Sequence, residues 1–222
     1  MSAGTGPALA WSGGKDSALA LWALREQGPA PTALLTTVTA DYDRVSMHGV
    51  RRSLLRMQAA ATGLPLVEVE IPAACTNEEY EQRMRAALAA PELAAVEEMA
   101  FGDLFLEDIR AYRESRLAAA GRRARFPLWG SDTYELAQRF VAAGFRAILV
   151  CVDPRALDPA FAGRDYDERL LADLPAGVDP CGENGEFHTF VTAGPVLAAP
   201  VAYQRGEVVE RDGFVFADLV ES

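Results

Sequence analysis

The sequence predicts an α/β protein: a doubly wound parallel sheet of the Rossmann type, followed by a smaller C-terminal part of the α+β type. Apolar, β-branched runs alternate with segments whose apolar residues recur at helical spacing, which is typical of such a sheet. Half of the 222 residues are hydrophobic, so the chain can bury a substantial core. A glycine-containing loop at residues 12–17 follows the first predicted strand, where these sheets bind ligands.

Strand and helix segments alternate through the first 129 residues. The predicted strands are residues 8–11, 33–39, 66–71, 96–101 and 126–129, and the predicted helices are residues 18–27, 50–62, 76–90 and 106–120. Gly63 is placed to end the second helix and Thr76 to begin the third. The stretches Ser12–Ser17, Gly102-Asp103 and Gly130–Asp132 all follow predicted strands, so we expect them at one edge of the sheet.

The pattern changes near residue 130, where we place a boundary between two domains, residues 1–129 and residues 130–222. A helix is predicted at residues 133–143 and a strand at residues 147–152. A polar, proline-containing stretch follows over residues 153–180. A hairpin with an Asp212-Gly213 turn closes the sequence.

The loop Ser12-Gly13-Gly14-Lys15-Asp16-Ser17 has the composition of a phosphate-binding site. A helix that begins at Asp16 and Ser17 would direct backbone N–H groups and the positive end of its dipole at an anion. The two glycines allow close approach of the backbone, and Lys15 adds a mobile positive charge. The spacing G-x-x-x-x-G-K-[ST] is absent from the sequence, so the loop is not a Walker A motif.

Composition excludes several classes of protein. The net charge is −11, which argues against nucleic-acid binding. The three cysteines, Cys75, Cys151 and Cys181, form no C-x-x-C pair, so neither a zinc knuckle nor a disulfide framework is indicated. The sequence has neither a signal-peptide pattern nor an apolar run of membrane-spanning length, and we therefore expect a cytoplasmic protein that does not enter membranes.

A second group of chemically active side chains lies in residues 179–189. Glu183, Glu186 and His188 surround two glycines, and in an extended segment Glu186 and His188 would face the same side. These side chains could present carboxylates to Mg²⁺, to an amine or to a proton in transfer. The alternative is a solvated polar loop that precedes a strand.

The loop resembles the S-G-G-x-D-S pyrophosphate loop of ATP pyrophosphatases, and the whole chain resembles the diphthine–ammonia ligase family within them. The resemblance is carried, in order along the chain, by Ser12–Ser17, His48, Gly102-Asp103, Arg116, Pro127–Trp129, Gly144-Phe145, Leu157, Gly163-Arg164 and Cys181–Thr189. It implies a Rossmann-like ATP pyrophosphatase fold. It also implies an ATP-binding domain at residues 1–129 and a substrate-side domain at residues 130–222.

The resemblance implies an AMP-forming ligase. ATP would adenylate the carboxylate of a diphthine-like acceptor, and ammonia would then displace AMP to leave an amide. ATP and Mg²⁺ are the expected cofactors. The expected ATP-binding residues are Ser12, Gly13, Gly14, Lys15, Asp16, Ser17 and Thr37. The expected catalytic residues are Lys15, Glu183, Glu186 and His188. His48, Asp103 and Arg116 are expected to contact substrate, and Asp16 and Asp103 to contact the metal.

The late family motif differs in this sequence. The family usually has E-G-G-E-[FY]-E-T, whereas residues 183–189 are Glu-Asn-Gly-Glu-Phe-His-Thr. The acceptor therefore stays open. Two other functions are also considered, a tRNA-modifying ATP pyrophosphatase and a nucleotide-binding regulatory protein without turnover. The sequence leaves the oligomeric state open as well, with a homodimer as one option.

Several of these residues have a plain structural alternative. Asp16 could cap the first helix instead of contacting Mg²⁺, and Asp103 could be a helix N-cap. His48 could hydrogen bond to the backbone. For two arginines of the fourth helix, Arg110 and Arg113, we favour ion pairs with Glu107 and Glu114, and for Arg116 a clamp on phosphate or carboxylate. Cys181 and Trp129 are expected to pack in the core.

Overall fold

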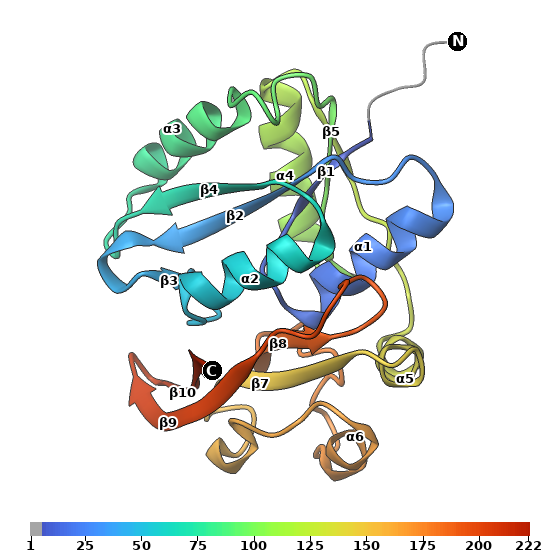
Figure 1. Cartoon of the computed structure of the whole chain (residues 1–222), viewed down its shortest axis with the longest axis vertical. Coiled ribbons are helices and arrows are strands. Elements are labelled where there is room, and N and C mark those ends of the chain that lie inside the picture. Colours follow the sequence, from blue (N-terminus) through green and yellow to red (C-terminus); the bar gives the residue numbers. More distant parts are fainter. Residues whose placement is uncertain (1–5) are drawn as a thin grey trace.

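The computed structural model describes residues 6–222, and within them the chain forms two β-sheets (Figure 1). In the first sheet the parallel strands run in the order β4-β2-β1-β5-β6, and a short strand, β3, pairs antiparallel with β2. The strands are β1 (Ala8–Ala10), β2 (Ala33–Thr39), β3 (Arg44–Val45), β4 (Leu66–Ile71), β5 (Glu98–Ala100) and β6 (Arg123–Arg125). The chain crosses from one side of β1 to the other between β4 and β5, so the strand order reverses beside β1. In an open α/β sheet this is where ligands bind.

Helices cover both faces of the first sheet (Figure 1). They are α1 (Lys15–Gln27), α2 (Arg52–Thr62), α3 (Asn77–Leu88) and α4 (Glu107–Ala119), and a 3₁₀ turn, η1 (Ala40–Tyr42), follows β2. The pair α1 and α2 lies between the two sheets, and the pair α3 and α4 lies on the opposite face. Two predicted helix ends are confirmed: Gly63 adopts the left-handed conformation after α2, and the Thr76 hydroxyl accepts the Glu79 N–H at the start of α3.

The second sheet is antiparallel, with strand order β8-β7-β10-β9. Its strands are β7 (Arg146–Val152), β8 (Phe187–Ala193), β9 (Tyr203–Arg211) and β10 (Phe214–Glu221). The helices α5 (Thr133–Ala142) and α6 (Glu168–Asp173) and the 3₁₀ turn η2 (Pro159–Phe161) complete this half. One apolar cluster extends from Leu19 and Leu54 on the first half to Phe190 on the second, so the two sheets share a core through α1 and α2.

The predicted fold class is confirmed, and so are most of its elements. The strand predicted at residues 126–129 is wrong, because the strand is β6, three residues earlier, and the chain turns at Phe126–Trp129. Pro127 explains the difference, since proline has no N–H to contribute to a strand ladder. The sequence also hides α6 within the polar stretch, whereas β8 is the strand considered after the cluster of glutamates and glycines and begins inside that cluster, at Phe187. The domain boundary near residue 130 stays a prediction; the first sheet ends at Arg125 and the second begins at Arg146.

Candidate active site

The two glycines of the loop between β1 and α1 are required by its geometry. Gly13 adopts a positive φ of 77°, and a Cβ there would lie 2.7 Å from Oε1 of Gln58. Gly14 is the N-cap of α1, and a Cβ on it would lie 3.0 Å from Cε1 of His48. Larger residues would therefore displace the side chains that surround the loop.

The second sheet holds this loop in place. The Lys15 N–H donates to Oγ1 of Thr189 at 3.0 Å, and the Val191 N–H donates to the Gly13 carbonyl at 2.8 Å. Gln58, fully buried on α2, donates through Nε2 to the Gly13 carbonyl at 2.9 Å. Sequence reasoning did not assign roles to Thr189 or Gln58. A glutamine among the apolar positions of a predicted helix was the only local signal for the second.

The start of α1 lies at the cleft, and its first backbone amides have no partner within the helix. The first hydrogen bond along the helix runs from the Ala18 N–H to the Gly14 carbonyl, so the N–H groups of Asp16 and Ser17 precede the helical ladder. The Ser17 hydroxyl donates to the Gly14 carbonyl at 2.8 Å. Gly102, after β5, packs against this turn: a Cβ there would lie 2.8 Å from the carbonyl carbon of Asp16. The end of β5 and the start of α1 are thus in direct contact.

Lys15 is a buried and fixed cation rather than the mobile charge that the sequence predicts. Its side chain is 2% exposed, and its Nζ lies 2.8 Å from the Asp16 carboxylate and donates to the Cys181 carbonyl. Burial by itself would lower the pKa of Lys15, but the Asp16 carboxylate, together with Cys181 and Glu183, more than offsets burial, so the pKa is raised and the ammonium stays charged.

Two further carboxylates line the same cleft. Glu183 accepts the Leu104 N–H at 2.7 Å, and burial raises its pKa to about 7. Asp103 forms an ion pair with Arg113 of α4, in which Nη2 donates to Oδ1 at 3.1 Å. The pair is incompletely hydrogen bonded, because Nε and Oδ2 lie 2.8 Å apart without being aligned for a bond.

His48 and His188 stack on each other in the cleft wall, with ring centroids 4.5 Å apart. Nδ1 of His48 donates to the Thr189 carbonyl at 3.2 Å, so the backbone bond expected for His48 is confirmed and the proton of the neutral ring sits on Nδ1. Desolvation lowers the pKa of His48 to about 3, helped by repulsion from His188, and lowers that of His188 to about 4. Both rings are therefore neutral at pH 7.

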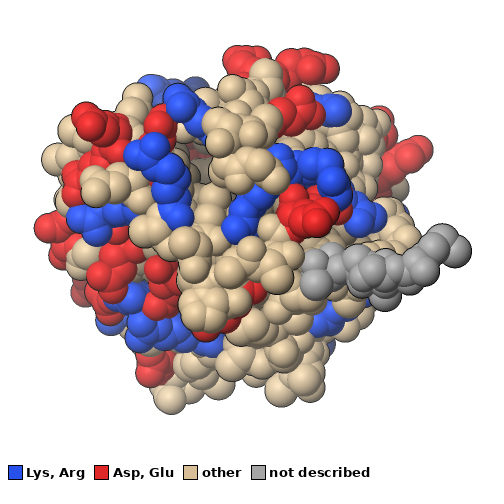
Figure 2. Space-filling view, turned by 90° about the horizontal axis from the view of Figure 1, so that it is seen from above, with Lys and Arg blue, Asp and Glu red and all other residues tan. Residues whose placement is uncertain are grey.

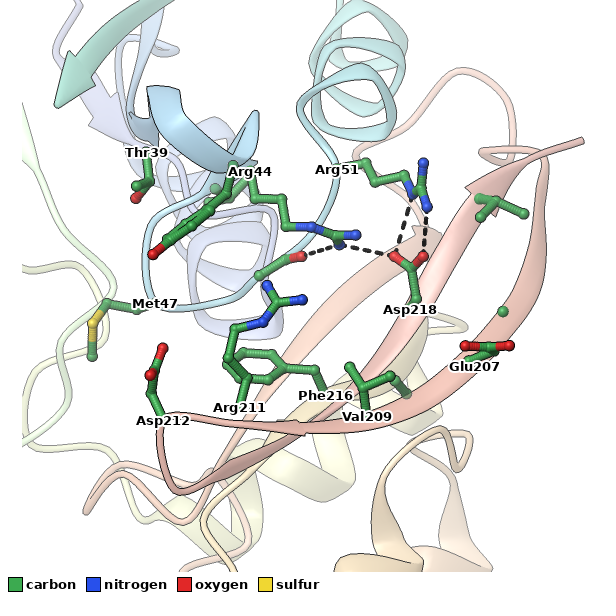
Figure 3. A pocket seen from close by; sticks show the side chains of 16 residues that line it. Thr39, Arg44, Met47, Arg51, Glu207, Val209, Arg211, Asp212, Phe216 and Asp218 are labelled. Carbon is green, nitrogen blue, oxygen red and sulfur yellow. Dashed lines mark hydrogen bonds and ion pairs between the residues drawn. The ribbon is translucent and has the colours of Figure 1, made fainter. Parts of the chain in front are cut away.

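The cleft that these residues line has a volume of about 620 Å³ and also includes Ser12, Thr36 and Thr37. Thr37 stands at the carboxyl end of β2 and its carbonyl accepts the Ser46 N–H at 3.1 Å. A second cavity, of about 470 Å³, lies between residues 39–51 and the hairpin formed by β9 and β10 (Figure 3). Its floor carries Asp218, which pairs with Arg44 at 2.8 Å and Arg51 at 2.7 Å.

Comparison with known proteins identifies the family to which the chain belongs. Residues 6–123 match the diphthamide synthase N-terminal domain, and residues 132–217 match the diphthamide synthase C-terminal domain. The chain belongs to the diphthine–ammonia ligase family. The cattle diphthine–ammonia ligase is 25% identical over 230 residues, which cover 94% of this chain and 86% of the relative, and the human protein is 24% identical with the same coverage. A relative from Schizosaccharomyces pombe, also a diphthine–ammonia ligase, is 25% identical over 90% of this chain and 36% of its own length.

Most of the predicted site residues of this family member meet in one cleft. Its lining includes Ser12, Lys15, Asp16, Ser17, Thr37, His48, Asp103, Glu183 and His188, and Gly13 and Gly14 form the adjoining loop. Asp16 and Asp103 are not helix caps, because Gly14 is the N-cap of α1 and Leu106 is the N-cap of α4. Both aspartates are instead paired with cations. Cys181 is buried, as predicted, and burial raises the pKa of its thiol to about 12.

Glu186 lies outside the cleft lining, so the prediction that it shares a face with His188 is wrong. It is buried, and its Oε1 accepts the Asp179 N–H at 3.0 Å and the Asn184 side-chain amide at 3.1 Å. The chain turns between residues 179 and 186, which directs this carboxylate inward. Its position supports the shape of the loop that carries Glu183.

The arginines of α4 are placed differently from the prediction. Arg116 does not line the cleft; its side chain is 54% exposed and pairs with Glu81 of α3 at 2.7 Å. Arg113 lines the cleft instead, and its predicted pairing with a glutamate is wrong. The pairing of Arg110 with Glu114 is confirmed at 2.8 Å. Trp129 is half-buried beneath the Arg110 guanidinium, 4.6 Å from the ring centroid, rather than in the core.

Surface charge, metal binding and membrane insertion are considered next. On the face seen in Figure 2, Lys and Arg side chains are interspersed with Asp and Glu. Within residues 6–222, no group of three or more His, Cys, Asp or Glu side chains is arranged to hold a metal ion. None of the helices in this part of the chain combines the length and the apolar character that a membrane span needs.

Proposed function

We propose that this protein is an ATP-dependent ligase that adenylates a carboxylate acceptor, amidates it with ammonia, and releases AMP and pyrophosphate. Diphthine is the acceptor in the names of the relatives. One observation carries the proposal: the glycine loop, the first amides of α1 and the buried Lys15 face the same cleft as Glu183 and Asp103. A nucleotide and an acceptor could therefore meet there.

The triphosphate of ATP would lie along the loop and the start of α1. The amides of Asp16 and Ser17 and the positive end of the helix dipole favour an anion at this place. Lys15 is charged and already fixed close by, so little reorganisation is needed when negative charge grows on the departing pyrophosphate.

A Mg²⁺ ion bound in the cleft would need phosphate oxygens of ATP among its ligands. Mg²⁺ usually binds through one or two carboxylates together with substrate phosphates, and Asp16 and Asp103 line the cleft as such carboxylates. Bound there, the ion would neutralise phosphate charge. Each aspartate would first have to exchange its present cation, Lys15 or Arg113, for the metal.

The two chemical steps make different demands on the protein. In the first, a carboxylate oxygen of the acceptor bonds to the α-phosphorus of ATP and the bond to pyrophosphate breaks. In the second, ammonia bonds to the acyl carbon and AMP leaves. Ammonia must be released from ammonium, and Glu183, whose pKa is about 7, is suited to accept that proton.

Product analysis tests the proposal. The protein is incubated with ATP, Mg²⁺, ¹⁵N-ammonium and diphthine-bearing elongation factor 2, and the nucleotides are separated by chromatography. Over many turnovers, AMP, pyrophosphate and a ¹⁵N-labelled amide are expected in equal amounts, and only when acceptor and ammonium are both present. Release of ADP, or of AMP without an acceptor, would refute the ligase chemistry.

A further inference from the structure

The second cavity, of about 470 Å³, takes no part in the proposed chemistry (Figure 3). It lies between residues 39–51 and one face of the hairpin formed by β9 and β10, and we call it the hairpin groove. Positions 207, 209 and 211 of β9 and positions 216, 218 and 220 of β10 all line it. Because residues two apart in a strand share a face, the hairpin presents a single face to the groove.

Three guanidinium groups and one carboxylate stand in the middle of the hairpin groove (Figure 3). Arg44 and Arg51 both pair with Asp218, at 2.8 Å and 2.7 Å, so two cations share one anion. The third guanidinium, of Arg211, has no ion pair within residues 6–222 and lies 5.9 Å from the centroid of the Tyr42 ring. The middle of the groove therefore has more positive than negative charge, in a chain whose net charge is −11.

The remaining carboxylates of the hairpin groove stand away from its middle. Asp212 lies in the turn of the hairpin, and Figure 3 shows Glu207 on the other side of the arginines. Neither carboxylate forms an ion pair with the part of the chain that the structure describes. An anion is therefore attracted to the middle of the groove, and not to its ends.

The arginines have hydrogen-bond donors left for a ligand. Arg44 donates only through Nη1, to the Gly49 carbonyl at 2.7 Å and to Asp218, so within residues 6–222 its Nε and Nη2 have no partner. The Arg211 guanidinium donates no hydrogen bond to any described residue. A guanidinium presents its N–H groups as a planar fork that matches the two oxygens of a carboxylate. A carboxylate in the groove would thus gain bonds that the protein itself does not use.

Exposed apolar side chains flank these arginines. Met47, 73% exposed, is the most exposed large apolar side chain within residues 6–222, and Tyr42 is 52% exposed. The backbone of Met47 is left-handed, with a φ of 69°, in a turn that the Gly49 N–H closes on the Val45 carbonyl at 3.0 Å. A strained turn that presents an apolar side chain to solvent favours a contact surface.

The hairpin groove adjoins the active-site cleft. Val45 and Met47 line both cavities. Between and beside them, His48 lines the cleft and Gly49 lines the groove, where a Cβ would lie 2.7 Å from the Phe216 ring. This short segment therefore forms a wall of both cavities.

We infer that the hairpin groove binds the polypeptide that carries the acceptor carboxylate, through a segment in which acidic side chains are flanked by apolar ones. The inference rests on the proposed function, because it takes the acceptor side chain to reach the cleft past Met47. A cleft of about 620 Å³ is far smaller than a protein, so the body of a protein acceptor has to be held outside it. Carboxylates of the segment would pair with Arg44 and Arg211, and its apolar side chains would cover Met47 and Tyr42.

Peptide binding tests the inference in the absence of nucleotide. The probe is a fluorescein-labelled peptide with two aspartates flanked by leucines, and its comparison has asparagines in place of the aspartates. Fluorescence anisotropy at low salt, where charge attraction is least screened, gives the dissociation constants. The wild-type protein should bind the aspartate peptide at least tenfold more tightly than the asparagine peptide.

Arg211→Glu should weaken the binding of the aspartate peptide at least tenfold. Arg205→Glu is the matched control, because Arg205 is on the same strand, is 48% exposed and lies outside the groove. Its ion pair with Asp165 is exposed and contributes little to stability, so this variant should change binding less than twofold. Tyr42→Glu, at another exposed position of the groove, repeats the test if Arg211→Glu unfolds.

Four results would overturn the inference. They are the absence of saturable binding, equal affinities for the two peptides, equal losses in the two arginine variants, and displacement of the aspartate peptide by inorganic phosphate at a similar concentration, which would indicate a site for small anions. Displacement by α,β-methylene-ATP would place the peptide in the cleft and would overturn it as well.

Amidation of diphthine-bearing elongation factor 2 separates the inference from the proposed function. Arg211→Glu should raise the KM for this acceptor at least fivefold and leave kcat unchanged, and a lower kcat at an unchanged KM would contradict the inference. If the wild-type protein does not amidate the factor, the proposed function fails. The peptide titrations need neither ATP nor turnover, and they then decide the inference by themselves.

Discussion

The contact between Thr189 and the phosphate loop offers a direct test of how the site is built. Oγ1 of Thr189, 3% exposed, accepts the Lys15 N–H at 3.0 Å. Thr189→Val preserves the shape of the side chain and leaves that N–H buried without an acceptor. An orphaned donor of this kind costs about 1–3 kcal/mol of unfolding free energy. For a chain of this size the cost lowers the melting temperature by about 2–4 °C per kcal/mol.

The same substitution should weaken ATP binding. The Lys15 amide fixes the first residue of α1, so without its partner the loop must be ordered when the nucleotide binds. If about 1.4 kcal/mol of that cost appears in binding, the Kd for ATP rises about tenfold. Calorimetric titration with α,β-methylene-ATP measures the change, and urea unfolding measures stability in parallel.

Thr192→Val is the matched control, on the same strand and outside the cleft. Its hydroxyl donates to the Arg146 carbonyl at 3.3 Å, and its side chain is 6% exposed. It should lose stability and keep the affinity for nucleotide. Equal nucleotide affinities in the Thr189→Val and Thr192→Val proteins would show that the hydrogen bond does not hold the loop.

Three further predictions concern the loop, the raised carboxyl pKa and the arginines. Gly13→Ala should cost about 1–2 kcal/mol of unfolding free energy, because φ is 77° there, and an unchanged urea midpoint would contradict this. The pKa of Glu183 is raised from 4.5 to about 7, so the stability that its neutral form contributes is complete below pH 4.5 and is lost as the pH rises through 7. The melting temperature of Glu183→Gln relative to wild type should therefore increase between pH 5 and pH 8. A difference in melting temperature that does not change with pH would count against the raised pKa. Arg113→Gln should reduce pyrophosphate release, because Arg113 lines the cleft and its ion pair positions the Asp103 carboxylate there. Arg116→Gln, at an exposed ion pair, should cost less than about 1 kcal/mol of stability and leave turnover intact. A loss of turnover in Arg116→Gln but not in Arg113→Gln would restore the predicted role of Arg116.

Local patterns explain why the first sheet and its loop could be predicted. Residues 33–39 and 66–71 are strands in the structure with the predicted bounds, because the first is a nearly continuous apolar run and the second alternates apolar residues with glutamates. The loop could be predicted from Gly13 and Gly14, because two adjacent glycines directly after an apolar run indicate a turn at that place in the chain.

Long-range packing explains what the sequence concealed. Arg113 and Arg116 are three residues apart on α4, and only the placement of α3 and β5 decides which of them faces the cleft. Glu186 and His188 would share a side of a straight strand, but the strand begins at Phe187 and the chain turns before it. Spacing along the chain cannot reveal where such a turn falls.

The hydrogen bond from Lys15 to Thr189 joins residues 174 positions apart, and it has a consequence for biosynthesis. The glycine loop is translated 174 positions before the threonine that fixes it. Until β8 has been synthesised, a nascent chain carries the loop sequence without the partner of its first helical amide. A fragment that stops before β8 would therefore have to associate with a second fragment before the loop could take its final form.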